Sequence, residues 1–271
     1  MFRKIGLSLL LILAMLTIGG CAAAPSSVMR APTAAPTATP DPWVQAVSDA
    51  QAVLADEDFD THFQSYQETA TKIDAYLAQL EAVRPALNLI DKMKQTELPV
   101  LGNLWDLLIR ALDKAYFGAG AGLDQVDEGL RDLLETHERL QRLDELDKTS
   151  AAIADFRENP SEETLRAMGE EMAEADFILT GVDKDAARLQ DKVEALLAAV
   201  KKTQSGLGLL GSLAPQLQDA VGQIQQFVDD IAGPLQELSQ TLDALRQQIA
   251  SDRDVFWQIR DIIHRAGAGT A

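Results

Sequence analysis

The side chains best suited to chemistry are one cysteine, Cys21, and three histidines, His62, His137 and His264. Histidine works as a metal ligand or as a general acid or base, and a thiolate as a nucleophile or metal ligand. A metal site needs several such groups close together, but no histidine stands at ligand spacing from another. Glu135 lies two residues before His137, whereas the carboxylate–histidine motif of helical bundles needs three. We therefore expect no metal, no cofactor and no enzymatic activity.

One carboxylate is notable for its position. Asp252 occupies a helical seam whose other members are apolar. We interpret it as a register-setting polar residue paired with an arginine, either Arg253 or one from another helix. The alternative is a polar group in a ligand pocket between helices. The acidic cluster of Glu170, Glu171 and Glu174 has no partner histidine and is typical of a solvated helix face.

The surroundings of Cys21 indicate a use for its thiol. Two basic residues precede an apolar run over residues 5–18, which is shorter than the roughly 20 residues of a membrane-spanning helix and typical of a secretory signal. The run ends in Ile18-Gly19-Gly20-Cys21, which resembles the lipobox of bacterial lipoproteins. The resemblance implies cleavage between Gly20 and Cys21 and a diacylglyceryl lipid on the Cys21 sulfur. An ordinary signal peptide and an uncleaved membrane anchor are the alternatives.

This resemblance divides the chain into a signal peptide (1–20), a lipidated tether (21–41), a helical body (42–267) and a short tail (268–271). The tether is rich in Pro, Ala and Thr, and its prolines favour an extended conformation. Such a protein is exported and anchored to the cell membrane or the outer membrane, with its body facing the periplasm or the outside. As the single cysteine, Cys21 excludes a disulfide within one chain.

The charge of the chain excludes one class of partner. Its net charge is −18 and becomes −20 once Arg3 and Lys4 are removed with the signal. Such a surface repels nucleic acid phosphates and anionic lipid headgroups, which bind through Lys and Arg. We expect no nucleic acid partner.

Apolar residues recur through the body at alternating steps of three and four, an average period of 3.5. This period is typical of helices that pack knobs-into-holes, as in coiled coils. Strand-type alternation is absent, so we predict an all-α fold without strands. The two longest series are Leu165, Met168, Met172, Ala175, Leu179, Val182, Ala186, Leu189, Val193, Leu196, Val200 and Leu217, Val221, Ile224, Val228, Ile231, Leu235, Leu238, Leu242, Leu245, Ile249, Asp252, Phe256, Ile259, Ile263.

Capping residues, prolines and glycines predict where the helices begin and end. The glycines at 118–122 and 206–211 are expected to separate helices. Pro85 and Pro234 fall inside expected helices and should kink them. The expected helices are 42–56, 60–96, 100–117, 123–157, 161–203 and 213–265.

Four of these helices are long and joined by short connections, so neighbours must run antiparallel. We predict an elongated antiparallel bundle with coiled-coil-like heptad seams, about 50–65 Å long. A homo-oligomer, in which helical hairpins pair through the same seams, is the alternative. Because successive long helices run away from the tether and back toward it in turn, segments 97–122 and 204–212 should lie together at the end away from the tether.

These two segments are the least charged parts of the body and are rich in glycine. We predict that they form an interaction tip, because an apolar exposed surface binds a partner or a membrane. The alternative is that helix 100–117 covers the open end of the bundle and buries its apolar side chains. The candidate tip residues are Leu104, Trp105, Leu108, Ile109, Leu207, Leu209 and Leu210.

The sequence therefore favours a membrane-tethered, non-enzymatic scaffold or protein-interaction module with a protein partner. One alternative is a bundle that interacts with lipid or membrane through its tip, which the net charge opposes. The other is a small-ligand sensor with a pocket between helices, for which Asp252 is the residue of interest.

Overall fold

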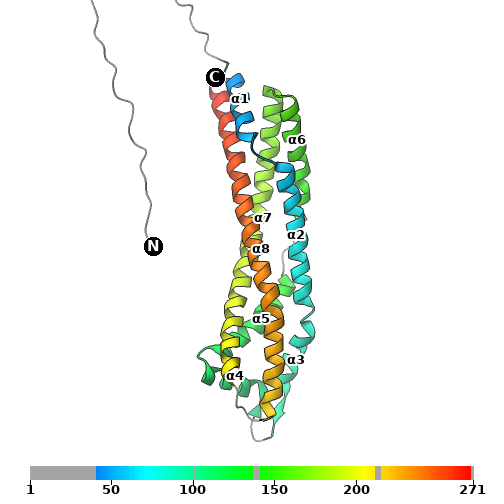
Figure 1. The fold of residues 1–271 in the computed structure, drawn as a ribbon, viewed down its shortest axis with the longest axis vertical. Coiled ribbons are helices and arrows are strands. Elements are labelled where there is room, and N and C mark those ends of the chain that lie inside the picture. The colour runs from blue at the N-terminus through cyan, green and yellow to red at the C-terminus, as the bar shows by residue number, and fades with distance from the viewer. Residues whose placement is uncertain (1–40, 100–101, 137–140, 211–214, 270–271) are drawn as a thin grey trace, which may run out of the picture. The chain divides into compact units, whose positions relative to one another are not determined.

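The computed structural model describes residues 41–99, 102–136, 141–210 and 215–269, which belong to one compact unit. These residues form the predicted all-α helical bundle (Figure 1). No helix among them combines the length and apolar character of a membrane span. The proposed processing site, Gly20 and Cys21, and most of the tether lie outside the described residues. The elements are α1 (Pro42–Leu54), α2 (Phe59–Glu81), α3 (Arg84–Gln95), β1 (Glu97–Leu98), β2 (Gly102–Asn103), α4 (Leu104–Ala115), α5 (Ala119–Thr136), the 3₁₀ helix η1 (Gln141–Leu146), α6 (Asp147–Glu158), α7 (Glu162–Leu209) and α8 (Pro215–Ala268).

Two long antiparallel helices, α7 and α8, pack against each other and organise the bundle (Figure 1). Helix α2 packs beside α8, and α3 continues in the same direction toward the lower end in the figure. On the other side, α5 and α6 follow each other along α7. Helix α1 packs against α8 at the upper end, and α4 packs against α5 at the lower end.

The predicted heptad seams form the core. All eleven residues of the 165–200 series are buried in α7. In α8, every member from Ile224 to Ile259 is buried, while Val221 and Ile263 are half-buried. Burial at this period is what two helices need to interlock along their length. The predicted seams of both long helices are therefore confirmed over the residues that the structure describes.

Pro85 separates two helices, so the prediction of one kinked helix over 60–96 is wrong. Helix α2 ends at Glu81, and Pro85 lies in the first turn of α3. Proline is compatible with that place because its missing N–H has no helical acceptor there. Pro234, in contrast, lies inside α8 as expected.

A short hairpin precedes α4, where no strand was predicted. Strands β1 and β2 pair antiparallel, with Glu97 opposite Asn103 and Leu98 opposite Gly102. Each strand has two residues, too few for a recognisable alternation of apolar and polar side chains. Asn103 then caps α4, because its side-chain oxygen accepts from the backbone N–H of Trp105 at 2.9 Å. Helix α4 therefore begins at 104 and not at 100.

Several glycines that were expected to break helices lie inside them. Helix α5 contains Gly120 and Gly122, and α7 continues through Gly206. A Cβ atom on Gly120 would lie 2.7 Å from the Ile109 carbonyl oxygen, and one on Gly206 would lie 2.5 Å from Ala119 Cβ. These glycines allow α4, α5 and α7 to approach closely.

The helix expected over 123–157 is divided into three. Helix α5 ends at Thr136, η1 spans 141–146, and α6 begins at Asp147. Leu143 and Leu146 in η1 are both buried. A 3₁₀ helix has a tighter turn than an α-helix, so this segment changes the register of the buried residues. His137 lies outside the described residues.

Candidate functional site

Segments 97–122 and 204–212 meet at the lower end of the bundle, as the topology predicted (Figure 1). The contact is close, since a Cβ on Gly206 of α7 would meet Ala119 of α5 and Leu112 of α4. The opposite end holds the start of α1, and Trp43 and Pro42 lie near Gly267 and Gly269 at the end of α8. The start of the body and this meeting point are therefore at opposite ends of α7 and α8.

The candidate tip residues divide into packed and exposed groups. Trp105, Leu108 and Leu207 are buried, and Leu104, Ile109 and Leu210 are half-buried. Leu209 is 64% exposed. The Trp105 ring is further fixed because its Nε1 donates to Asp124 Oδ1 at 3.0 Å, and Lys94 Nζ lies 5.1 Å from its centroid. Helix α4 thus covers the end of the bundle with most of its apolar face.

The most exposed apolar group at this end is one that the sequence argument did not select. Phe117 is 95% exposed and Tyr116 is 45% exposed, in the turn between α4 and α5. Gly118 completes the turn with a φ of 81°, a conformation that favours glycine. The available signal was the pair of aromatics directly before this glycine, since such a turn leaves little to pack against.

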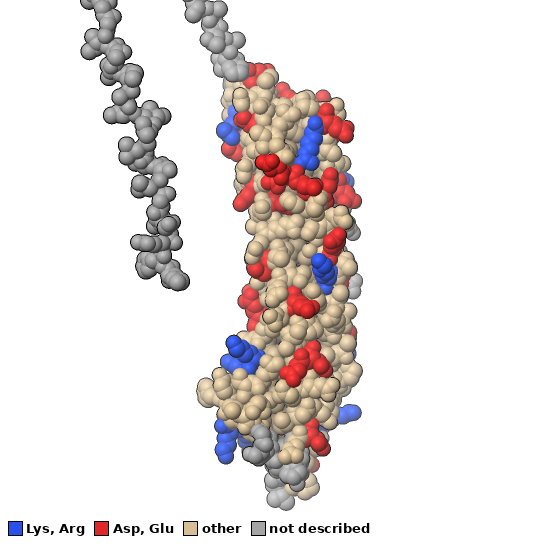
Figure 2. All heavy atoms as spheres, viewed as in Figure 1, with Lys and Arg blue, Asp and Glu red and all other residues tan. Residues whose placement is uncertain are grey.

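Basic side chains gather around this turn. Arg110 and Lys114 are exposed on α4, and Lys201 and Lys202 are exposed on α7. Segments 104–122 and 199–210 together contain these four basic residues and only two acidic ones, Asp106 and Asp113. Figure 2 shows basic side chains at the lower end of the viewed face, where acidic ones are also present, and acidic side chains along its whole length. These two segments therefore carry a net charge of +2, opposite in sign to that of the whole chain, and two acidic residues of other segments, Asp124 and Asp229, contact them.

The seam residue Asp252 is buried, but the prediction of an arginine partner is wrong. Tyr66 Oη donates to Asp252 Oδ2 at 2.6 Å, and His62 Nδ1 lies 2.9 Å from Asp252 Oδ1. Arg253 instead donates from Nε to Asp176 Oδ1 of α7 at 2.6 Å. Asp252 therefore connects α8 to α2, and its neighbour Arg253 connects α8 to α7.

Burial governs the ionisation of this cluster. It raises the pKa of the Asp252 carboxyl above its ordinary value, although the Tyr66 hydrogen bond and the His62 charge and hydrogen bond act in the opposite direction. Burial also raises the pKa of the Tyr66 hydroxyl, and the neighbouring Asp252 adds to the rise, so Tyr66 remains a neutral donor. The rings of Phe59 and Phe256 stack with their centroids 5.5 Å apart, and Phe59 also contacts the His62 ring. The cluster is packed on its apolar side and acts as an interhelical contact.

A second buried carboxylate, Asp127, joins α5 to α3. Lys94 Nζ donates to Asp127 Oδ2 at 2.7 Å, and Arg131 Nε donates to Oδ1 at 2.9 Å. Arg131 also donates to Asp91 Oδ1 and to the Leu87 carbonyl oxygen, each at 3.1 Å. Both carboxylate oxygens of Asp127 therefore already accept from cations of the bundle itself.

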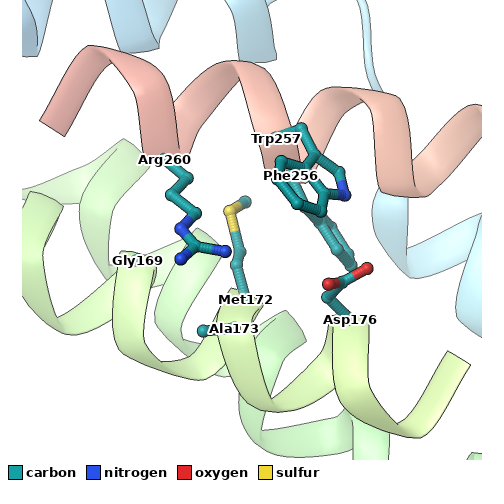
Figure 3. A pocket seen from close by; sticks show the side chains of 7 residues that line it. All are labelled: Gly169, Met172, Ala173, Asp176, Phe256, Trp257 and Arg260. Carbon is teal, nitrogen blue, oxygen red and sulfur yellow. The ribbon is translucent and has the colours of Figure 1, made fainter. Parts of the chain in front are cut away.

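A small pocket opens between α7 and α8 near their upper end (Figure 3). Its cavity volume is about 40 Å³, enough for a water molecule but not for a metabolite. Asp176 lines it but is already paired with Arg253, and Arg260 lies 5.3 Å from the Trp257 ring centroid. The lining residues are Gly169, Met172, Ala173, Asp176, Phe256, Trp257 and Arg260.

A larger, open hollow of about 430 Å³ lies where the α1–α2 turn meets the end of α6. Its basic residue, Arg157, donates to the backbone carbonyl oxygens of Leu54 and Glu57. Glu57 and Asp58 also line the hollow and make it negatively charged. Arg157 is the one cation among the lining residues. The hollow is therefore a poor site for an anionic ligand.

No group of three or more His, Cys, Asp or Glu side chains in the described ranges is placed to hold a metal ion. Comparison of the chain with protein-family models and with curated proteins gives no match. The strongest candidate surface of the described chain is the end of the bundle where α4, the turn at Tyr116–Gly118 and the end of α7 meet, here named the α4–α5 end.

Proposed function

We propose that the protein is an exported, lipid-anchored helical bundle that acts as a non-enzymatic spacer and interaction module in a bacterial cell envelope. The lipobox-like Ile18-Gly19-Gly20-Cys21 supports the anchor, and the proline-rich segment after it supports a tether. Two acyl chains hold a protein at a membrane more firmly than one, so a processed lipoprotein stays attached.

The observation that carries the spacer role is the length of α7 and α8. They contain 48 and 54 residues, so each extends about 70–80 Å at the α-helical rise. The body begins at Pro42, directly after the tether, at the end of the bundle where α8 finishes. The α4–α5 end therefore lies at the opposite end of both helices from Pro42, the first residue of the body.

The hydrogen bonds of the buried carboxylates support a role without catalysis. Asp252 and Asp127, the two buried carboxylates of the described core, are each bonded to side chains of a neighbouring helix. An active site usually holds such groups in a cleft where substrate can reach them. Here they hold α2 to α8 and α3 to α5, which stiffens the bundle.

Metabolic labelling tests the anchor. Cells expressing the protein are fed a clickable palmitate analogue, and their membrane and soluble fractions are compared. We expect the label and the protein in the membrane fraction, and we expect Cys21→Ser to remove the label and release the protein. A labelled Cys21→Ser chain, or an unlabelled wild-type chain in the soluble fraction, would contradict the proposal.

Site-specific crosslinking tests the interaction role. A photoreactive amino acid replaces Phe117 at the far end or, as the control, Val44 in α1, which is 67% exposed near the tether. We expect a discrete crosslinked product at 117 and none at 44. Equal products at both positions would indicate general crowding and count against a specialised far end.

A further inference from the structure

The turn between α4 and α5 presents aromatic side chains on a firmly bonded backbone. The Tyr116 N–H donates to the Leu112 carbonyl oxygen at 2.8 Å, and the Ala119 N–H donates to the Tyr116 carbonyl oxygen at 3.0 Å. Asp113 Oδ1 accepts from the Gly120 N–H at 2.9 Å. The N–H groups of Tyr116, Ala119 and Gly120 are thus bonded on both sides of the exposed Phe117.

Exposed apolar side chains are concentrated at this end. Of the six large hydrophobic residues exposed in the described part of the chain, Tyr116, Phe117 and Leu209 belong to these two segments. Lys201, Ser205 and Leu209 follow one another at intervals of four on the exposed face of α7. Residues at this spacing share one face of a helix, so the apolar side chain of Leu209 and the basic side chain of Lys201 lie on the same face of α7.

The basic side chains come from α4, which leads into the turn, and from α7, which packs against α5. A Cβ on Gly122 of α5 would lie 3.3 Å from Lys202 Cβ, so Lys202 lies against the start of α5. Arg110 and Lys114 extend from α4, with Asp106 Oδ2 4.0 Å from Arg110 Nη2. Two exposed aromatics and four exposed cations thus belong to the segments that meet at this end of an otherwise acidic chain.

We propose that this end binds the interfacial region of an anionic lipid bilayer, with Phe117 and Tyr116 at headgroup depth. Aromatic rings favour this region, and Lys and Arg beside them pair with lipid phosphates. A protein partner fits less well, because a stable interface buries about 800 Å² on each side. The exposed apolar surface here consists of three side chains, which is sufficient for a membrane contact.

The inference deepens the proposed function, because it rests on the α4–α5 end being the contacting surface. With a lipid on Cys21 and a bilayer contact at Phe117, the protein would have two separate attachments to membrane. The two ideas are separable, since the bilayer contact needs no lipid on the protein. A chain of residues 21–271 with Cys21→Ser therefore tests the bilayer contact without the lipid anchor.

Vesicle binding measures the contact. The Cys21→Ser chain is mixed with vesicles of phosphatidylglycerol and phosphatidylcholine, or of phosphatidylcholine alone, and sedimented. We expect binding to the anionic vesicles that weakens as salt rises, because salt screens surface charges. Phe117→Ala should lower the affinity about tenfold, since it removes one buried aromatic ring. Trp257→Ala is the control and should have no effect, because this aromatic of α8 is 52% exposed and lies near the other end of the bundle.

The basic residues are tested separately. Lys201→Gln with Lys202→Gln should lower the affinity about twenty-five-fold, at about fivefold for each cation near an anionic surface. Lys148→Gln with Lys184→Gln removes the same charge from exposed positions in α6 and α7 and should leave binding unchanged. Equal losses in both double variants would make the effect one of net charge and overturn the assigned surface.

An environment-sensitive label reports which end enters the bilayer. Because Cys21 is the only cysteine, Phe117→Cys or Val44→Cys in the Cys21→Ser chain gives one attachment site for a nitrobenzoxadiazole dye. We expect its emission to rise on vesicle addition at 117 and not at 44. Absence of vesicle binding, or equal emission changes at both positions, overturns the proposal. Palmitate labelling with no vesicle binding would leave the anchor standing and remove only this contact.

Discussion

Tyr66 Oη donates to Asp252 Oδ2 at 2.6 Å across the interface between α2 and α8. Both side chains are buried, and they are 186 residues apart in the chain. A buried carboxylate is costly unless its oxygens are bonded, so this contact favours one register of α2 on α8. It lies in the half of the bundle near the proposed tether, where α1 and α2 pack on α8.

Removal of this hydroxyl should destabilise the bundle. Tyr66→Phe leaves Asp252 Oδ2 without its donor, and we expect the free energy of unfolding to fall by about 1–3 kcal/mol. Urea denaturation followed by circular dichroism measures it. Tyr116→Phe removes the hydroxyl of a half-exposed tyrosine and should change the value by less than about 0.5 kcal/mol. Equal effects of the two substitutions would contradict the role of the buried contact.

The free energy of unfolding should depend on pH through the ionisation of Asp252. Its folded-state pKa is raised, mainly by burial, so the folded state binds this proton more tightly than the unfolded state. The contribution to stability is fully present below the unfolded pKa of about 3.9 and is lost as pH rises through the folded pKa. We expect wild type to lose stability relative to Asp252→Asn over this range. Urea titrations of both proteins from pH 4 upward check this; a difference independent of pH would contradict it.

The long helices were predictable because the spacing of their apolar residues repeats along their whole length. Each turn of α7 adds another buried residue at the 3.5 period, so one misplaced position changes nothing. The hairpin before α4 and the division at η1 were missed because each depends on a few residues and on what they pack against. The pairing of Asp252 was missed for a related reason, since the position of α2 beside α8 decides which donor is near.

The candidate tip was predictable in place but not in detail. Topology alone brings α4, the start of α5 and the end of α7 to one end of the bundle. Which side chains remain exposed depends on the face that α4 turns toward α5 and α7. Trp105 and Leu108 therefore pack inward, whereas Phe117, in the turn that follows, projects from the surface.

The glycines of α7 allow a matched comparison within one helix. A Cβ on Gly206 would lie 2.5 Å from Ala119 Cβ, whereas one on Gly208 would have no neighbour within 4 Å. Gly206→Ala should destabilise the protein by about 1–3 kcal/mol through overpacking. Gly208→Ala should stabilise it by about 0.5–1 kcal/mol, because alanine favours the helix. Thermal denaturation of both variants measures the difference; similar changes of either sign would disprove the close approach of α5 and α7.

The buried carboxylate Asp127 should be essential to the junction of α3 and α5. Asp127→Asn removes the charge that faces Lys94 and Arg131, whose donors lie at 2.7 Å and 2.9 Å. Both cations are about one-third exposed, so water compensates part of the loss, and we expect about 1–3 kcal/mol of destabilisation. Glu128→Gln, at an exposed position of the same helix, is the control and should lie within about 0.5 kcal/mol of wild type. Hydrogen exchange should show where the loss falls, with faster exchange in α3 than in the first turns of α7. Faster exchange spread evenly over both helices would mean that Asp127 supports the whole bundle and not this junction.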